Sequence, residues 1–197
     1  MAVGVEEQRR PGRPRSPEAD AAILQAAAEL FAEHGFDGMS VDAVAQQAGV
    51  SKATIYRRYP GKIELCMAAG RHLCDRQVPI VDTGSVHDDL RNLARSHARL
   101  LRTTVVGRGA AQMIADAARN PELAAAYRSF TAERRATIVA AIQRGVERGE
   151  LPADLDGELA AEMLTGAIFY RHLIGRGRLN ARFADDVADA VLRSLCR

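Results

Sequence analysis

The 197-residue chain has no tryptophan, few aromatic residues of any kind (5%) and only three cysteines. The spacing of these cysteines, Cys66, Cys74 and Cys196, forms no disulfide framework, which is typical of a reducing compartment. No apolar run approaches the ~20 residues that a membrane-spanning helix needs, and the N-terminus has no apolar secretion segment. We therefore expect a cytoplasmic protein without membrane contact, whose core is packed mainly from alanine and leucine.

The sequence also lacks the residue patterns that carry catalysis or bind metals. No nucleophile and base occur as a recognisable set, and there is no glycine-rich phosphate loop. Cys66 and Cys74 lie eight residues apart with His72 between them. This spacing matches no usual zinc site, so buried thiols are the favoured interpretation. We expect no catalytic residue, no metal and no cofactor, and we interpret the chain as a non-enzyme.

Basic residues are concentrated in two short segments, although the formal net charge is only +2. The first is a Pro- and Gly-rich arm at residues 1–15, which we expect to be disordered in isolation. Its arginines resemble those of an AT-hook-like segment that enters a DNA minor groove. A solvated tail with non-specific attraction to phosphate is the alternative, and both interpretations remain open. The arginines concerned are Arg9, Arg10, Arg13 and Arg15.

The second basic segment, from Ser40 to Lys62, has the layout of a helix-turn-helix. Ser40 can cap a first short helix, and Gly49 supplies the left-handed backbone that ends it. Ser51 can cap a second helix, in which Ile55 points inward and polar residues point outward. In this layout the first helix braces against the DNA backbone and the second enters the major groove. The segment therefore predicts DNA binding.

The stretch from Ala21 to Leu65 resembles the DNA-binding domain of the tetracycline-repressor (TetR) family of transcriptional regulators. The similarity runs in order and without gaps through LF, HGF, SV, VA, AGVSKATIYRRY and PGK. It implies an all-α fold of about nine helices, with a DNA-binding head before a larger helical domain. It also implies a homodimer that binds double-stranded DNA at a palindromic operator, and an unidentified small-molecule effector that releases it.

The resemblance implies DNA contacts for a defined set of side chains. Lys52 and Arg57 lie where base edges can be reached, and a lysine suits guanine O6 or N7. Ala53 can pack on a thymine methyl group. Tyr56 matches a family tyrosine that contacts phosphate, whereas Tyr59 matches a position that is more often structural. The complete set comprises Ser40, Lys52, Ala53, Thr54, Tyr56, Arg57, Tyr59 and Lys62.

Helical periodicity and cap residues divide the chain after the arm into two domains. Residues 16–77 are the expected DNA-binding domain, and residues 78–197 the ligand-binding and dimerisation domain. No strand-like alternation interrupts the pattern. We expect glycines at 107 and 109 to end the fifth helix. The expected helices cover about 17–35, 41–48, 52–59, 62–77, 86–106, 110–119, 121–149, 156–174 and 181–195.

The rear helices offer candidates for an effector pocket, each with a structural alternative. His97 and Arg134 could fix a polar group of a ligand, or could be a hydrogen-bonded core histidine and an arginine in an intramolecular pair. The low aromatic content argues against a cage for cationic ligands. The candidates, for which burial in an ordinary core is the alternative, are His97, Met113, Tyr127, Phe130, Arg134, Met163 and Phe169.

The last two helices are the candidates for a dimer interface. The resemblance implies that they pair with their twins in a four-helix arrangement. Apolar residues of the ninth helix recur at helical spacing, and the eighth helix has apolar residues on two sides. The candidate interface residues are Leu164, Ala167, Phe183, Val187 and Val191.

Together these features predict a dimeric, ligand-responsive transcriptional repressor located in the cytoplasm at the nucleoid. A DNA-binding protein of the same fold with a nucleoid or division role is the alternative. Many scattered sites, in place of one palindrome beside the gene, would favour that alternative. An enzyme in the rear domain is a third class, and no motif supports it.

Overall fold

The computed structural model describes residues 16–175 and 177–195, and within them every regular element is a helix. This confirms the all-α prediction and the number of helices. The elements are α1 (Pro17–Gly38), α2 (Val41–Gln47), α3 (Lys52–Tyr56), α4 (Lys62–Gln77), α5 (Val86–Thr103), α6 (Val105–Arg119), α7 (Pro121–Glu147), α8 (Gly157–Leu173) and α9 (Ala181–Leu195). None of the described helices combines the length and apolar character needed to cross a bilayer.

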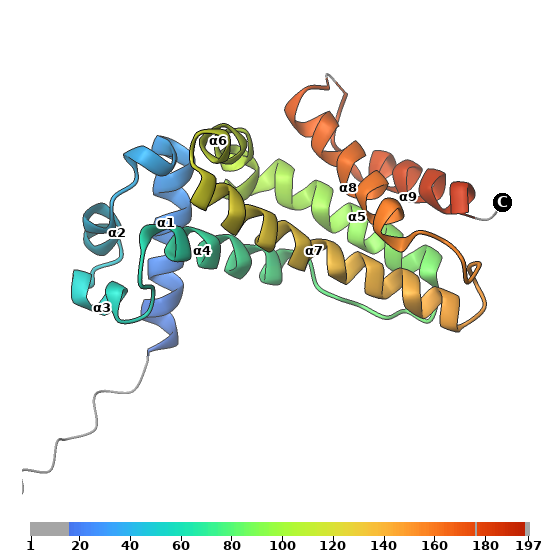
Figure 1. The fold of residues 1–197 in the computed structure, drawn as a ribbon, viewed down its shortest axis with the longest axis horizontal. Coiled ribbons are helices and arrows are strands. Elements are labelled where there is room, and N and C mark those ends of the chain that lie inside the picture. The colour runs from blue at the N-terminus through green and yellow to red at the C-terminus, as the bar shows by residue number, and fades with distance from the viewer. Residues whose placement is uncertain (1–15, 176, 196–197) are drawn as a thin grey trace, which may run out of the picture.

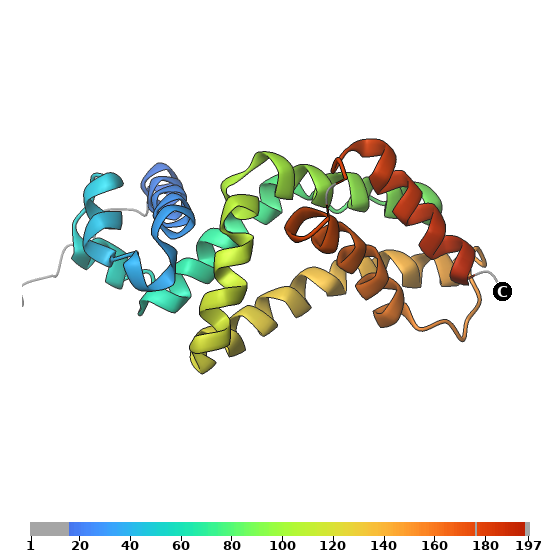
Figure 2. The ribbon, with the colours of Figure 1, turned by 90° about the horizontal axis from the view of Figure 1, so that it is seen from above.

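The helices form a small head and a larger body, joined along α4. Figures 1 and 2 show α1, α2 and α3 at one end of the molecule and α8 and α9 at the other. One apolar core lies mainly among α1 to α4, and a second lies among α5, α7, α8 and α9. The head core also contains Met113 of α6 and Leu123 of α7. Packing therefore crosses the expected domain boundary after residue 77.

Cap residues start the helices where the sequence predicts. Ser16, Ser40 and Ser51 each accept a hydrogen bond from a backbone N–H three residues ahead, at 3.3, 3.1 and 3.2 Å. Asn120 and Asp156 do the same for α7 and α8. These bonds satisfy amides that the first turn of a helix otherwise leaves free. The predicted starts of these helices are therefore confirmed.

Three helix ends differ from expectation. The first helix extends to Gly38 and not to Gly35, where its backbone is kinked. The third helix ends at Tyr56 rather than Tyr59, because Tyr59 precedes Pro60 and a residue before proline disfavours helical backbone. The fifth helix ends at Thr103, not near Val106. Thr104 then caps α6, since its Oγ1 accepts from the N–H of Val106 at 3.2 Å.

Gly107 lies inside α6 and does not end a helix. A Cβ at this position would lie 1.7 Å from the backbone oxygen of Leu101 in α5. Glycine is therefore needed for the close approach of the two helices, and the expectation that Gly107 and Gly109 break a helix is wrong.

Candidate DNA-binding surface and internal cavity

The turn between α2 and α3 has the backbone that a helix-turn-helix requires. Gly49 has φ +65°, a left-handed conformation that favours glycine. The N–H of Val50 then donates to the oxygen of Ala45, which closes the end of α2. Val44 of α2 and Ile55 of α3 are almost fully buried in the head core. This packing fixes α3 and turns its opposite side to solvent.

The solvent side of α3 presents most of the predicted DNA contacts. Lys52, Ala53, Tyr56 and Arg57 are all exposed, with Tyr56 52% exposed despite its large ring. Within the described part of the chain, no residue bonds to the Tyr56 hydroxyl or the Arg57 guanidinium. Lys52 pairs with Asp42 of α2, and both side chains are more than half exposed. Exposed pairs of this kind contribute little, so Lys52 can exchange Asp42 for a DNA group.

Two residues of the predicted DNA-binding set, Ser40 and Thr54, have hydroxyl groups that take part in helix capping. The Ser40 oxygen accepts from the N–H of Ala43, which leaves its own proton free to donate. Thr54 shares a 2.9 Å hydrogen bond with the hydroxyl of Ser51. Ser40 is exposed at the start of α2 and Thr54 is partly buried. Ser40 is therefore the better placed of the two for a phosphate oxygen.

Tyr59 is held by an intramolecular contact. Its hydroxyl donates to Asp20 of α1 at 2.8 Å, and Arg58 donates to the same oxygen at 2.8 Å. Burial, with this hydrogen bond, raises the pKa of Tyr59. The structure thus favours the structural role of Tyr59 over a phosphate contact. It also turns Arg58 toward α1, since that side chain is largely buried in the pair.

Lys62 connects the start of α4 to the corner between α1 and α2. Its Nζ donates to the backbone oxygens of Met39 at 3.0 Å and Asp37 at 3.5 Å, and it lies 4.4 Å from the ring centroid of Phe36. A lysine has three donors, so one stays available for phosphate. The expected phosphate contact of Lys62 is therefore compatible with the structure. The predicted minor-groove residues Arg9, Arg10, Arg13 and Arg15 lie outside the described residues.

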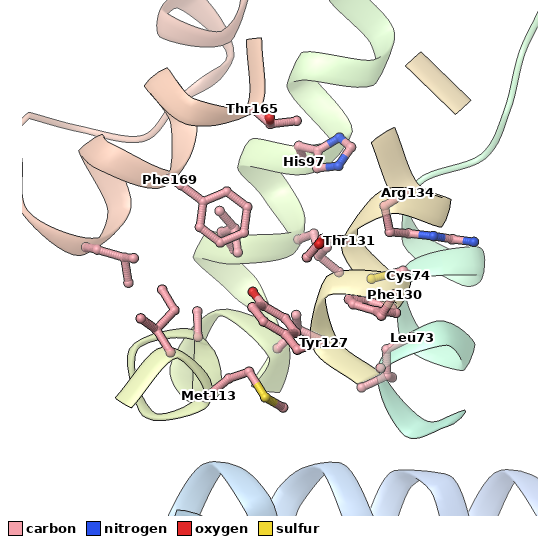
Figure 3. A pocket seen from close by; sticks show the side chains of 18 of the residues that line it. Leu73, Cys74, His97, Met113, Tyr127, Phe130, Thr131, Arg134, Thr165 and Phe169 are labelled. Atoms are coloured by element: carbon pink, nitrogen blue, oxygen red, sulfur yellow. The ribbon is translucent and has the colours of Figure 1, made fainter. Parts of the chain in front are cut away.

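A cavity of about 540 Å³ lies between the head and the body, walled by α1 and by α4 to α8. Figure 3 shows its side chains, and the lining is mostly apolar. Its size falls within the range of small-molecule sites, about 300–1,000 Å³. It contains six of the seven predicted pocket residues: His97, Met113, Tyr127, Phe130, Arg134 and Phe169.

Met163 does not line the cavity, so this prediction is wrong. The side chain is 41% exposed on the outer side of α8, whereas Phe169 lies on the side that faces the cavity. The sequence interpretation missed the contribution of α4, which supplies Leu73 and Cys74 to the cavity wall. Segment 62–77 carries the signal for this contribution, because it has more apolar residues than the head core alone can bury.

His97 and Arg134 make intramolecular contacts and also line the cavity. The buried His97 ring is bonded through Nδ1 to the backbone oxygen of Leu93 at 3.1 Å. Burial lowers the pKa of His97, so its imidazole is neutral at neutral pH. Arg134 pairs through Nη1 with Asp75 of α4 at 2.6 Å. Both residues therefore have the structural role that was expected as the alternative, and both also lie at the cavity wall.

Cys66 and Cys74 are buried free thiols on α4. Burial raises the pKa of Cys66 to about 12 and that of Cys74 to about 11. Both are therefore protonated at neutral pH, which suits packing rather than metal binding. Across residues 16–175 and 177–195, no three potential ligands of the His, Cys, Asp or Glu type form a metal-binding group.

The predicted dimer residues Val187 and Val191 of α9 are buried within the protomer. Val187 and Val191 are buried against α5, and ion pairs of Arg91 with Asp189 and of Arg95 with Asp185 flank them. Leu164 of α8 is likewise fully buried. These three apolar residues therefore cannot form a surface for a partner, because their own chain covers them. The other two candidates, Ala167 and Phe183, are partly buried, and the Phe183 ring lies under the Arg171 guanidinium.

The side of α8 that stays exposed is also apolar. Leu159, Met163, Tyr170 and Ile174 are between 41% and 70% exposed. Within α8, Leu159, Met163, Ala167 and Tyr170 recur at spacings of four, four and three residues, and Ile174 directly follows the helix. That spacing places the four along one face of the helix, as in a helix-pairing seam. Tyr170 and Ile174 also line the cavity.

Comparisons with known proteins identify both parts of the chain. Residues 23–69 match the family described as "Bacterial regulatory proteins, tetR family". Residues 80–191 match the family "Tetracyclin repressor-like, C-terminal domain". The chain is 35% identical over 181 residues to the uncharacterized HTH-type transcriptional regulator YdeS of Bacillus subtilis, with 91% of each protein covered.

A second relative and a crystal structure agree with this assignment. The chain is 31% identical to the DNA-binding transcriptional repressor TetR of Mycobacteroides abscessus, with 90% of this chain and 93% of that protein covered. It is similar to the crystal structure of the TetR family transcription regulator SCO0332, with a TM-score of 0.75, 29% identity, and coverage of 91% of this chain and 100% of that one. The chain belongs to the TetR family, and it is a DNA-binding transcriptional regulator of the helix-turn-helix type.

Proposed function

We propose that this protein is a dimeric repressor that a small molecule releases from a palindromic DNA operator. The main support for this proposal is that α4 contacts both the DNA-binding head and the cavity. This helix begins directly after the helix-turn-helix, and further along it supplies Leu73 and Cys74 to the cavity wall. A molecule in the cavity therefore touches the element that positions the DNA-reading head. The Mycobacteroides abscessus relative, which is named a repressor, supports the direction of regulation.

On DNA, the exposed side of α3 enters the major groove. Lys52 and Arg57 contact base edges or phosphates, and Ala53 packs on a base. Tyr56 and Ser40 donate hydroxyl protons to phosphate oxygens, which fix position without reading sequence. Thr54 and Lys62 add polar contacts at the edges of this surface. The exposure of Tyr56 and Arg57 supports these roles, since an apolar ring and an arginine remain in solvent in the free protomer.

The dimer forms through the exposed apolar face of α8, with α9 beside it. A second copy is the occupant, because a two-fold axis places two recognition helices on one duplex. These must fit half-sites about 34–36 Å apart, one turn of DNA. A single recognition helix of five residues reads too few bases for useful specificity, and this need supports pairing through the seam that contains Met163 and Tyr170.

A second contact between body and head supports the proposal that the body controls the distance between the two heads of the dimer. Asp116 of α6 is buried, and its Oδ2 accepts from the backbone N–H of Phe36 at 2.7 Å. Gly35, the preceding residue, has φ +71° and bends the end of α1 at this contact. Because α6 also lines the cavity through Met113, a ligand touches both routes to the head, α4 and α6.

Fluorescence anisotropy with DNA from upstream of the protein's own gene tests the proposal. We expect tight, salt-sensitive binding of two protomers to one palindrome, and at least a tenfold loss for the Arg57→Ala variant. Deleting the gene should raise transcription from that promoter. Equal affinity for unrelated DNA would contradict operator binding, and lower transcription after deletion would contradict repression.

A further inference from the structure

The few polar groups of the cavity wall are not evenly distributed. Figure 3 shows His97 and Arg134 toward one side and Phe169 and Met113 toward the other, with the apolar Phe130 and Leu73 on the side of Arg134. The polar residues come from α5 and α7, and Cys74 of α4 lies beside them. The polar part of a ligand would therefore lie next to the helix that leads to the DNA-binding head.

His97 offers a hydrogen-bond acceptor to this space. A backbone oxygen can only accept, so the contact of Nδ1 with Leu93 places the proton of the neutral ring on Nδ1. The second nitrogen, Nε2, then carries a lone pair. None of the described residues donates to it. A buried acceptor of this kind favours a ligand that brings an N–H or O–H group.

Arg134 does not offer a second polar contact. Its Nε is buried and has no hydrogen-bond partner among the described residues, whereas Nη1 is paired with Asp75. Because this Nε has almost no accessible surface, a ligand oxygen in the cavity cannot reach it. His97 is therefore the polar group of this pair that a ligand can contact.

Each arginine at the cavity wall is already paired. Asp75 compensates Arg134, while Arg135 pairs with Glu158 and lies 3.8 Å from Glu162. His97 is neutral. An anion would therefore meet no unpaired cation, and the one carboxylate in excess, Glu162, is 60% exposed, where water screens its attraction for a cation. Burial of a charged ligand would be costly.

We propose that the cavity binds a neutral, mainly apolar molecule that carries a hydrogen-bond donor, as in an amide. Its N–H donates to Nε2 of His97, and its apolar part lies toward Phe169 and Met113. The Tyr127 hydroxyl, which also lines the cavity, provides a further polar contact. This ligand class rests on the proposed function, because it describes the effector of the same cavity.

Isothermal titration calorimetry of the full-length protein tests the ligand class with three probes of equal chain length. Decanamide is neutral with a donor and an acceptor, decanoate is an anion, and decyltrimethylammonium is a cation. We expect decanamide to bind at least tenfold more tightly than either charged probe. Tighter binding of decanoate or of the cation, or no binding of decanamide, would overturn the proposal.

A variant tests the polar contact. His97→Leu should weaken decanamide binding at least tenfold. The matched control Tyr56→Phe removes a hydroxyl from the DNA-binding surface and should leave decanamide binding unchanged. Unchanged affinity in the His97→Leu variant would overturn the proposed contact. If that variant fails to fold, the ranking of the three probes on the unaltered protein still decides the ligand class.

A DNA titration of the same preparations separates this inference from the proposed function. Binding to the palindrome without a preference for decanamide overturns only the ligand class. Failure to bind any specific DNA contradicts the repressor proposal, whatever the calorimetry shows. We expect the unaltered protein to bind the palindrome and to lose at least tenfold in affinity when decanamide is saturating.

Discussion

Replacing Asp116 by alanine is expected to weaken the connection between body and head. Asp116 is only 4% exposed, and its two oxygens accept from three donors. Oδ2 accepts from the N–H of Phe36 at 2.7 Å, while Oδ1 accepts from Gln112 at 2.8 Å and from Arg119 at 2.6 Å. Of these three hydrogen bonds, only the one from Phe36 connects α6 to α1. The alanine variant removes it and leaves a buried N–H without a partner.

The size of the effect follows from that bond. Leaving a buried donor unpaired costs about 1–3 kcal/mol, toward the upper end where the lost partner is charged. We therefore expect Asp116→Ala to lower the free energy of unfolding by about 2–3 kcal/mol. For a chain of this size the melting temperature should fall by roughly 4–12 °C. Circular dichroism melts measure this loss.

The same variant should weaken binding only to DNA that both heads of the dimer must contact at once. Asp116 is far from α3 in sequence and is buried, so phosphate contacts stay intact. Affinity for the palindrome should fall about tenfold, about 1.4 kcal/mol, because a less fixed head pays more ordering entropy on binding. Affinity for a single half-site should not change.

Arg119→Met is the matched control for Asp116→Ala. It removes the ion pair of the largely exposed Arg119 but keeps the contact with Phe36. Its stability and palindrome affinity should stay close to those of the parent. If Asp116→Ala destabilises the protein but leaves palindrome affinity unchanged, the contact only stabilises the fold and does not position the head.

Three further substitutions test the surfaces and the packing. Arg57→Ala should reduce the slope of log affinity against log salt concentration by about one, as expected for a lost phosphate contact; an unchanged slope would remove Arg57 from that set. Met163→Glu should give a folded monomer in sedimentation, whereas Val187→Glu should melt at a much lower temperature because it buries an unpaired charge. A dimeric Met163→Glu variant would place the interface elsewhere. Gly107→Ala should destabilise by more than about 3 kcal/mol in a denaturant titration, since its Cβ would meet the backbone of Leu101, and a neutral result would refute this packing.

The head was predictable from sequence because local signals determine it. Ser40 and Ser51 cap their helices, Gly49 takes the left-handed conformation, and Ile55 is buried, as expected. Each of these features depends on a few neighbouring residues. The starts of α5, α7, α8 and α9 were predictable for the same reason, whereas α6 begins at Val105 and not near Ala110.

The errors concern features that depend on tertiary packing. Gly107 has the local character of a helix end, but the distance to Leu101 shows that it serves a close contact between helices. The stripe with Val187 and Val191 has the period of any buried helix face, and the period does not identify the covering element as α5 or a partner. The contact of Asp116 with Phe36 joins residues 80 positions apart and had no local signal.

Mapping the DNA sites of the protein across the genome of its native cells tests the central claim most directly. Chromatin immunoprecipitation with sequencing would record these sites with and without saturating effector. We expect a few palindromic sites at promoters, one of them beside the protein's own gene, with occupancy that falls when the effector is present. Many scattered sites away from promoters, with occupancy that no effector changes, would contradict it.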